Sequence, residues 1–252
     1  MFNGIAGLYD FMNTAMTAGL HHRWRARAAE LAAVGPGSRV LDVATGTGDL
    51  ALELARRVTP GGEVVASDFA ELMLARARAK AAKAPHPLVR PRFEPADALA
   101  LPYANDSFDA ATVGFGVRNF SDLARGLREM ARVVRPGGRV VVLEITAPAR
   151  APLSLFYGIW FDRIVPTLGR ALGALLGMRS RAGGDREQAA VGEAYSYLPS
   201  SVKRFPPPAQ LAAEMERAGL RQIRFLLLAG GIIAIHVGTV PGSLAAAGPG
   251  QV

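Results

Sequence analysis

Along residues 34–146, short apolar runs alternate with stretches in which apolar residues recur every three or four positions. The apolar runs are bounded by glycine, proline and aspartate, and this predicts buried strands at 39–44, 63–68, 89–94, 107–116 and 135–146. The other stretches have the spacing of amphipathic helices, at 49–58, 70–83 and 121–134, as does the earlier stretch 9–33. The alternation predicts an α/β fold with a mostly parallel sheet and helices on both faces.

Residues 221–240 break this alternation. Two apolar runs are separated there only by Ala229-Gly230-Gly231, which predicts an antiparallel hairpin at the edge of what becomes a seven-stranded sheet. We expect one domain over residues 1–240. Its predicted parts are N-terminal lid helices (1–33), a cofactor-binding core (34–146), a substrate-side insertion (147–205) and C-terminal strands (206–240). The tail 241–252 is rich in glycine, alanine and proline and is predicted to be disordered.

The amino-acid composition excludes several kinds of site and indicates possible partners. The 252 residues include no cysteine, which excludes disulfides, thiolate metal sites and a cysteine nucleophile, and the four histidines lack metal-ligand spacing, so we expect no metal. The net charge of +8 favours anionic partners, namely nucleic acid, anionic lipid or phosphate-bearing substrates, but it also fits a composition that is merely rich in alanine, arginine and glycine. The N-terminus has no secretory signal pattern, and no run of about 20 apolar residues occurs. We therefore expect a cytoplasmic protein, with peripheral contact to the inner face of the membrane left open.

The stretch LDVATGTGD (41–49) places two glycines in the turn after the first predicted strand. No lysine follows Gly48, which excludes a P-loop. A dinucleotide fingerprint would fit the spacing with Ala51 in its third position, but Asp49 would stand where the pyrophosphate binds and would repel it. S-adenosylmethionine has no phosphate and carries a sulfonium and an ammonium group. Its positive charge suits an acidic turn, so Gly46 and Gly48 are expected to contact this cofactor.

Aspartates also stand at the ends of the predicted strands. Asp42 ends the first strand, Asp68 ends the second and Asp97 follows the third, so with Asp49 they converge on the sheet edge where open α/β folds bind ligands. Asp68 is placed to accept the ribose hydroxyls and Asp97 to accept the adenine amine. Asp42 and Asp49 are placed to bound the cationic methionine moiety. The pattern therefore predicts an S-adenosylmethionine site.

Several motifs of the sequence also resemble those of known protein families. VLDVATGTGD, SDFAELML, DALALPYANDSFD and VVRPGGRVVVLE resemble, in order and spacing, the motifs of Rossmann-like class I methyltransferases. More narrowly, YDFMNTAMTAGLHHRWR, GFGVRNFSD and YSYLPSSVKRFP resemble the ubiquinone/menaquinone C-methyltransferase family, over residues from about 5 to 240. The resemblance implies C-methylation of a prenylated hydroquinone, with demethylmenaquinol as the substrate we expect. It places cofactor contacts at Thr47, Asp68, Asp97 with Ala98, and Gly114, where the family often has serine.

The implied reaction suggests catalytic roles. Arg118 directly follows the fourth predicted strand, so we expect it to stabilise the ring oxyanion, with Asn119 hydrogen-bonded to the ring oxygen. Arginine cannot act as a base at neutral pH, so the proton would leave through water, His21 or an acid. Tyr9 and Asp10 lie in the predicted lid, and Asp10 is a second candidate for the base.

Residues 153–178 mix apolar and arginine residues. This composition is typical of a helix at an anionic membrane surface, but packing of a lid or of a homodimer explains it equally well. Three other functions stay open. One is a methyltransferase for a polyketide or a sterol-like molecule. Another is a nucleic-acid binding protein, suggested by the charge but lacking a recognised module, so that no nucleic acid is expected. The third is a non-catalytic scaffold.

Overall fold

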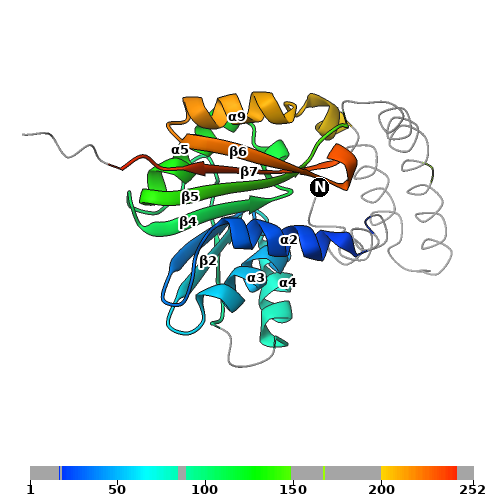
Figure 1. Ribbon diagram of the computed structural model, residues 1–252. Coiled ribbons are helices and arrows are strands. Elements are labelled where there is room, and N and C mark those ends of the chain that lie inside the picture. Colours follow the sequence, from blue (N-terminus) through cyan, green and yellow to red (C-terminus); the bar gives the residue numbers. More distant parts are fainter. Residues whose placement is uncertain (1–16, 18, 85–88, 149–166, 168–199, 243–252) are drawn as a thin grey trace, which may run out of the picture.

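A seven-stranded sheet with the order β3-β2-β1-β4-β5-β7-β6 forms the centre of the computed structural model (Figure 1). The structure describes residues 17, 19–84, 89–148, 167 and 200–242. The strands are β1 (Arg39–Val43), β2 (Glu63–Asp68), β3 (Arg92–Pro95), β4 (Phe108–Gly114), β5 (Val134–Ile145), β6 (Arg221–Leu228) and β7 (Ile233–Thr239). Strands β1 to β5 are parallel, whereas β7 pairs antiparallel with both β5 and β6. The predicted mixed sheet with its antiparallel edge hairpin is confirmed.

Helices cover both faces of this sheet (Figure 1). Side chains of α2 (Leu20–Leu31), α3 (Asp49–Val58) and α4 (Glu71–Ala82) pack into one hydrophobic core. Side chains of α5 (Leu123–Val133) and α9 (Pro208–Arg217) pack into a second. Neighbouring strand residues point to opposite faces, so Val40 belongs to the first core and Leu41 to the second. This is why the strands read as continuous apolar runs.

Residues 206–240, predicted as C-terminal strands, also contain the helix α9. Pro208 occupies the first turn, where its fixed φ suits a helix, and the helix is followed by Gly219 with φ 97°. Leu211 and Met215, one turn apart, are both buried against the second core. The spacing was therefore present in the sequence, although the prolines before it obscured the start of the helix.

Several expectations fall on residues outside the described ranges. Of the predicted helix 9–33 the structure describes α2, while Tyr9 and Asp10 lie outside the described residues. The same holds for nearly all of 153–178 and for the tail from residue 243 onward. Within the described part of the chain, no helix combines the length and apolarity needed to cross a bilayer. The division of residues 1–240 into four parts stays a prediction.

Candidate active site

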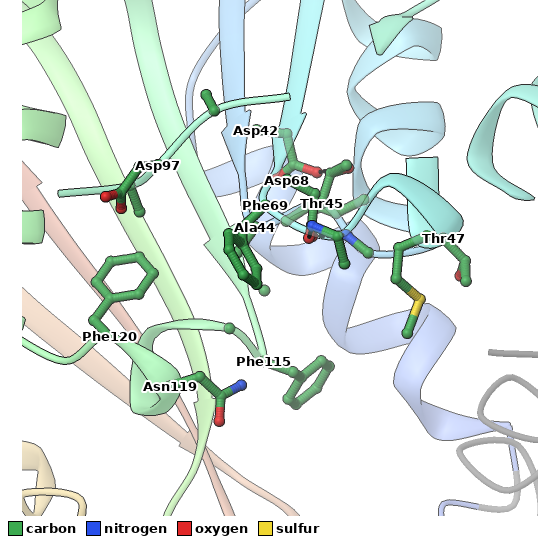
Figure 2. A pocket seen from close by; sticks show the side chains of 18 of the residues that line it. Asp42, Ala44, Thr45, Thr47, Asp68, Phe69, Asp97, Phe115, Asn119 and Phe120 are labelled. Carbon is green, nitrogen blue, oxygen red and sulfur yellow. Dashed lines mark hydrogen bonds between the residues drawn. The ribbon is translucent and has the colours of Figure 1, made fainter. Parts of the chain in front are cut away.

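A cavity of about 460 Å³ opens at the carboxyl ends of β1, β2 and β4 (Figure 2), a volume in the usual range for small-molecule sites. Figure 2 shows Asp97 and Thr47 toward opposite ends of it, with Phe115 and Asn119 along one side. The described residues that line it are Arg25, Asp42, Ala44, Thr45, Gly46, Thr47, Asp49, Leu50, Asp68, Phe69, Ala70, Met73, Ala96, Asp97, Ala98, Leu99, Gly114, Phe115, Gly116, Asn119, Phe120 and Ser121.

The glycine turn between β1 and α3 forms one wall. Gly46 and Gly48 both have positive φ, 57° and 84°, a conformation that side chains disfavour. A Cβ on Gly48 would also lie 3.0 Å from Phe93 and 3.1 Å from Ala77, so this glycine additionally lets α3 approach α4 and β3. The turn thus requires glycine for two different reasons.

Asp68 ties the end of β2 to this turn. Its Oδ2 accepts a hydrogen bond from the Gly46 amide (2.8 Å), and its Oδ1 accepts one from the Ala70 amide (2.8 Å). Burial raises the pKa of Asp68, while backbone amides of Ala70, Gly46 and Phe69 oppose the rise. Its contact with the ribose hydroxyls stays a prediction. The next residue, Phe69, also lines the cavity and is 87% exposed.

Asp42 lies deeper, and its side chain is satisfied by hydroxyl groups. Thr112 donates to its Oδ1 (2.6 Å) and Thr45 donates to its Oδ2 (2.6 Å). Burial raises the pKa of Asp42 to about 6, although both hydroxyls favour the ionised form. A carboxylate in this setting gains from a nearby positive charge. The placement agrees with the prediction that Asp42 bounds a cationic moiety, which stays a prediction.

Asp49 differs from expectation because two cations of the chain already face it. Lys80 from α4 donates to its Oδ1 (2.7 Å), and Arg25 from α2 lies 3.5 Å from its Oδ2. Burial acts to raise the pKa of Asp49, but Arg25 and Lys80 outweigh it and the net pKa is lowered. Lys80 also donates to the Thr47 hydroxyl (3.0 Å). Asp49 therefore pairs with two cations of the chain beside the turn, and its expected place beside the cationic methionine moiety stays a prediction.

The far end of the cavity is formed after β3 and β4. Asp97 lines it together with Ala98, and its Oδ1 accepts the Leu99 amide (2.9 Å). Gly114 lines it as well, where the family often has serine. A Cβ there would lie 3.1 Å from Cδ2 of Leu50, so a side chain would be tightly held against α3. These positions suit the contacts implied by the resemblance, which stay predictions.

Arg118 forms a buried ion pair in the structure, and its expected contact with the ring oxyanion stays a prediction. Its Nη1 donates to Oε1 of Glu144 (2.6 Å) and to the Phe115 carbonyl (2.6 Å), and the Arg118 and Glu144 side chains are 6% and 1% exposed. Arg118 does not line the cavity, whereas Asn119 in the 3-10 turn η2 (Val117–Asn119) does. The buried pair therefore fixes the backbone after β4 and so positions Asn119.

His21 is not among the described residues that line the cavity. It is buried on α2, and its Nδ1 contacts Nη1 of Arg25, one helical turn later. This contact suits a role in orienting Arg25, and the expected role of His21 as proton acceptor stays a prediction. Arg25 itself lines the cavity and was not singled out from the sequence. Its only sequence signal is its position four residues after His21, which places both on one helix face.

Among the described residues, no group of three or more histidines, aspartates or glutamates is arranged to hold a metal ion. The expectation of a metal-free site concerns the whole chain and stays a prediction. The carboxylates of this cavity instead meet hydroxyls, amides and cationic side chains, as described above.

Comparisons with known proteins identify the family of this chain. Residues 1–240 match the ubiE/COQ5 methyltransferase family. The chain is 45% identical to a demethylmenaquinone methyltransferase of Thermus thermophilus over 241 residues, covering 96% of this chain and 100% of that protein. It is 40% identical to the ubiquinone/menaquinone biosynthesis C-methyltransferase UbiE of Geobacter sulfurreducens, covering 94% and 86%.

A solved SAM-dependent methyltransferase from Aquifex aeolicus shares the fold, with a TM-score of 0.55 at 18% identity, covering 82% of this chain and 84% of that one. The Rossmann-like class I fold and the resemblance drawn from the motifs are thereby confirmed. With S-adenosylmethionine as the methyl donor, the protein is a methyltransferase, and the chain belongs to the ubiE/COQ5 methyltransferase family.

Proposed function

We propose that this enzyme transfers the methyl group of S-adenosylmethionine to a ring carbon of a prenylated hydroquinone, demethylmenaquinol, to give menaquinol. The observation that carries the proposal is the cavity itself, in which aspartates from the ends of β1 and β2 and from the loop after β3 face a glycine turn. Such a wall repels phosphates and receives a sulfonium and an ammonium group. The names of the two relatives support the substrate class.

The energetics of the reaction indicate what the protein has to supply. A ring carbon is a weak nucleophile until the neighbouring hydroxyl ionises, and ionising a phenol of pKa about 10 at pH 7 costs about 4 kcal/mol. Holding the methyl donor and the carbon in line contributes about 7–11 kcal/mol. Positioning is therefore the larger contribution, and stabilisation of the phenolate the smaller one.

The chain's own residues divide these tasks. Asp68 holds the ribose hydroxyls, Asp97 accepts the adenine amine, and Asp42 faces the positive part of the cofactor. Asn119 donates to the ring oxygen from the turn that Arg118 and Glu144 hold in place. Tyr9 and Asp10, outside the described residues, stay proposals for ring contact and for proton acceptance.

The prenyl tail calls for an apolar path to the bilayer. We assign this role to residues 153–178, which would bring the enzyme to the inner, anionic face of the membrane as a peripheral protein. Flotation with anionic vesicles tests the assignment, since an enzyme that never floats, with or without a prenylated quinol, would point to lid or dimer packing instead.

The decisive experiment is incubation with methyl-labelled S-adenosylmethionine and chemically reduced demethylmenaquinone, followed by mass analysis. One labelled methyl group on a ring carbon is the expected product, and the oxidised quinone is the matched control that should stay unlabelled. A reduced benzoquinone precursor in parallel distinguishes the two ring classes. Labelling of neither ring, with intact cofactor binding, would refute the proposal.

A further inference from the structure

Arg25 brings a positive charge into an otherwise acidic cavity. Its side chain extends from the buried face of α2, and the residue is 9% exposed. Among the described residues that line the cavity it is the one with a cationic side chain. The other ionisable groups of that lining are carboxylates, namely Asp42, Asp49, Asp68 and Asp97. The presence of one cationic side chain among four aspartates suggests that it binds a negatively charged group of the ligand.

The contacts of Arg25 leave one edge of its guanidinium available. Within the described part of the chain, its contact with Nδ1 of His21 and its ion pair with Asp49 (3.5 Å) both use Nη1. Its Cζ lies 5.4 Å from the centre of the Phe115 ring, which also lines the cavity. The Nε and Nη2 donors form the planar edge that binds a carboxylate through two parallel hydrogen bonds.

We infer that Arg25 binds the carboxylate of the methionine moiety of S-adenosylmethionine and so selects cofactors that carry it. The inference rests on the proposed function, in which this molecule is the methyl donor. The cofactor has one negative group, and the aspartates of the cavity repel it unless a cation receives it. Arg25 stands beside Asp49 at the glycine turn, on the side of the cavity expected to hold the methionine moiety.

The neighbours of Arg25 explain how it keeps its orientation. Asp49 and His21 hold Nη1 from α3 and from the preceding turn of α2. A further contact fixes α2 itself, because Nη2 of Arg57 in α3 donates to the Ala26 carbonyl (2.9 Å). The guanidinium is therefore placed before the cofactor arrives, which lowers the entropic cost of binding. A rival role, in which Arg25 faces the ring oxygen of the substrate, predicts no dependence on the cofactor's carboxylate.

The test is a comparison of two ligands against two proteins by calorimetry. Wild type and Arg25→Met are each titrated with S-adenosylmethionine and with its decarboxylated analogue, without quinol. We expect Arg25→Met to weaken S-adenosylmethionine about ten- to hundredfold, as for a hydrogen bond between charged groups, and to change the affinity of the analogue less than about twofold. An equal loss for both ligands, or no loss for either, would overturn the inference.

Two further variants separate carboxylate recognition from structural damage. Arg23→Met changes an exposed arginine on the same helix and should leave both affinities unchanged. Lys80 does not itself line the cavity, but Lys80→Met releases the lining residues Asp49 and Thr47, so it should weaken both ligands by the same factor. A loss confined to S-adenosylmethionine in Lys80→Met would assign the carboxylate to Lys80 and refute the role of Arg25.

Arg25→Lys covers the case in which Arg25→Met does not fold. It keeps the charge but loses the two-donor edge, so an intermediate loss, again confined to S-adenosylmethionine, is expected. Wild type that binds neither ligand would contradict the proposed function itself. Wild type that binds both while Arg25→Lys loses them equally would contradict the inference alone.

Discussion

Replacing Glu144 by glutamine tests whether the buried pair with Arg118 holds the loop after β4. Both side chains are almost fully excluded from water, and Glu144 also accepts the Ile145 amide (2.8 Å) through Oε1. Glutamine keeps the shape of the side chain but leaves the Arg118 cation without its counter-charge. Removing one partner of a buried ion pair costs about 3–5 kcal/mol, because the other charge stays buried.

The expected loss is large enough to measure in two ways. Urea unfolding should show a free energy of unfolding lowered by about 3–5 kcal/mol, and the melting temperature should fall by about 10 °C, at about 3 °C per kcal/mol for a chain of this size. Turnover should fall more than cofactor affinity, because Asn119 follows Arg118 in the displaced turn and faces the cavity.

An exposed pair provides the control. Glu214 and Arg217 on α9 are 2.5 Å apart, but their side chains are 30% and 68% exposed, so Glu214→Gln should cost less than about 1 kcal/mol. A comparable, small loss in Glu144→Gln would refute the reasoning. The double variant Glu144→Gln/Arg118→Met should recover part of the stability, since it removes the uncompensated charge.

Three further predictions concern the cavity. Burial raises the pKa of Asp42 to about 6, above its ordinary value of 3.8, so the folded protein loses stability as pH rises between these two values. From pH 4.5 to pH 7.5, the free energy of unfolding in urea should therefore change by about 2 kcal/mol in favour of Asp42→Asn relative to wild type. Parallel pH curves for the two proteins would contradict this. Gly46→Ala should cost about 1–2 kcal/mol through its positive φ alone, whereas Gly48→Ala should cost about 2–4 kcal/mol because it also meets Phe93; equal losses would show that crowding is irrelevant. Phe69→Ala should change thermal stability little, since the ring is 87% exposed, but raise the Kd for cofactor about tenfold by loss of stacking on adenine, and an unchanged Kd would remove Phe69 from the site.

The part of the site that follows from strand order was predictable from the sequence. Asp42, Asp68 and Asp97 end or follow successive parallel strands, and the carboxyl ends of such strands share one edge of the sheet. The apolar runs of the sequence give the carboxyl ends of β1 to β5 to within one or two residues, as with β2, which is predicted and found at 63–68. Contacts that depend only on the order and direction of the strands can therefore be predicted from the sequence.

The contacts that the sequence did not reveal depend on packing between distant elements. Arg25 reaches the cavity because α2 lies against α3, and its spacing of four residues from His21 does not by itself indicate that contact. Glu144 had a usable signal, an acid at the end of an apolar run. Its strand β5 neighbours β4, and Gly114 pairs with Leu143, which places Glu144 beside the loop that holds Arg118. Without that register, the sequence does not indicate that Arg118 pairs with Glu144.

These opposite charges share one physical role. Arg25 and Lys80 meet Asp49 from two different helices, and Arg118 in the turn η2 meets Glu144 of β5. Each pair therefore joins elements that the hydrogen bonds between strands do not hold together. Charges arranged in this way are paired before any ligand arrives, and they cost no reorganisation when the methyl group moves. A reaction in which positioning outweighs acid–base chemistry is best served by such a rigid edge. The same reasoning predicts that the Arg118–Glu144 pair contributes to turnover by holding the turn that carries Asn119.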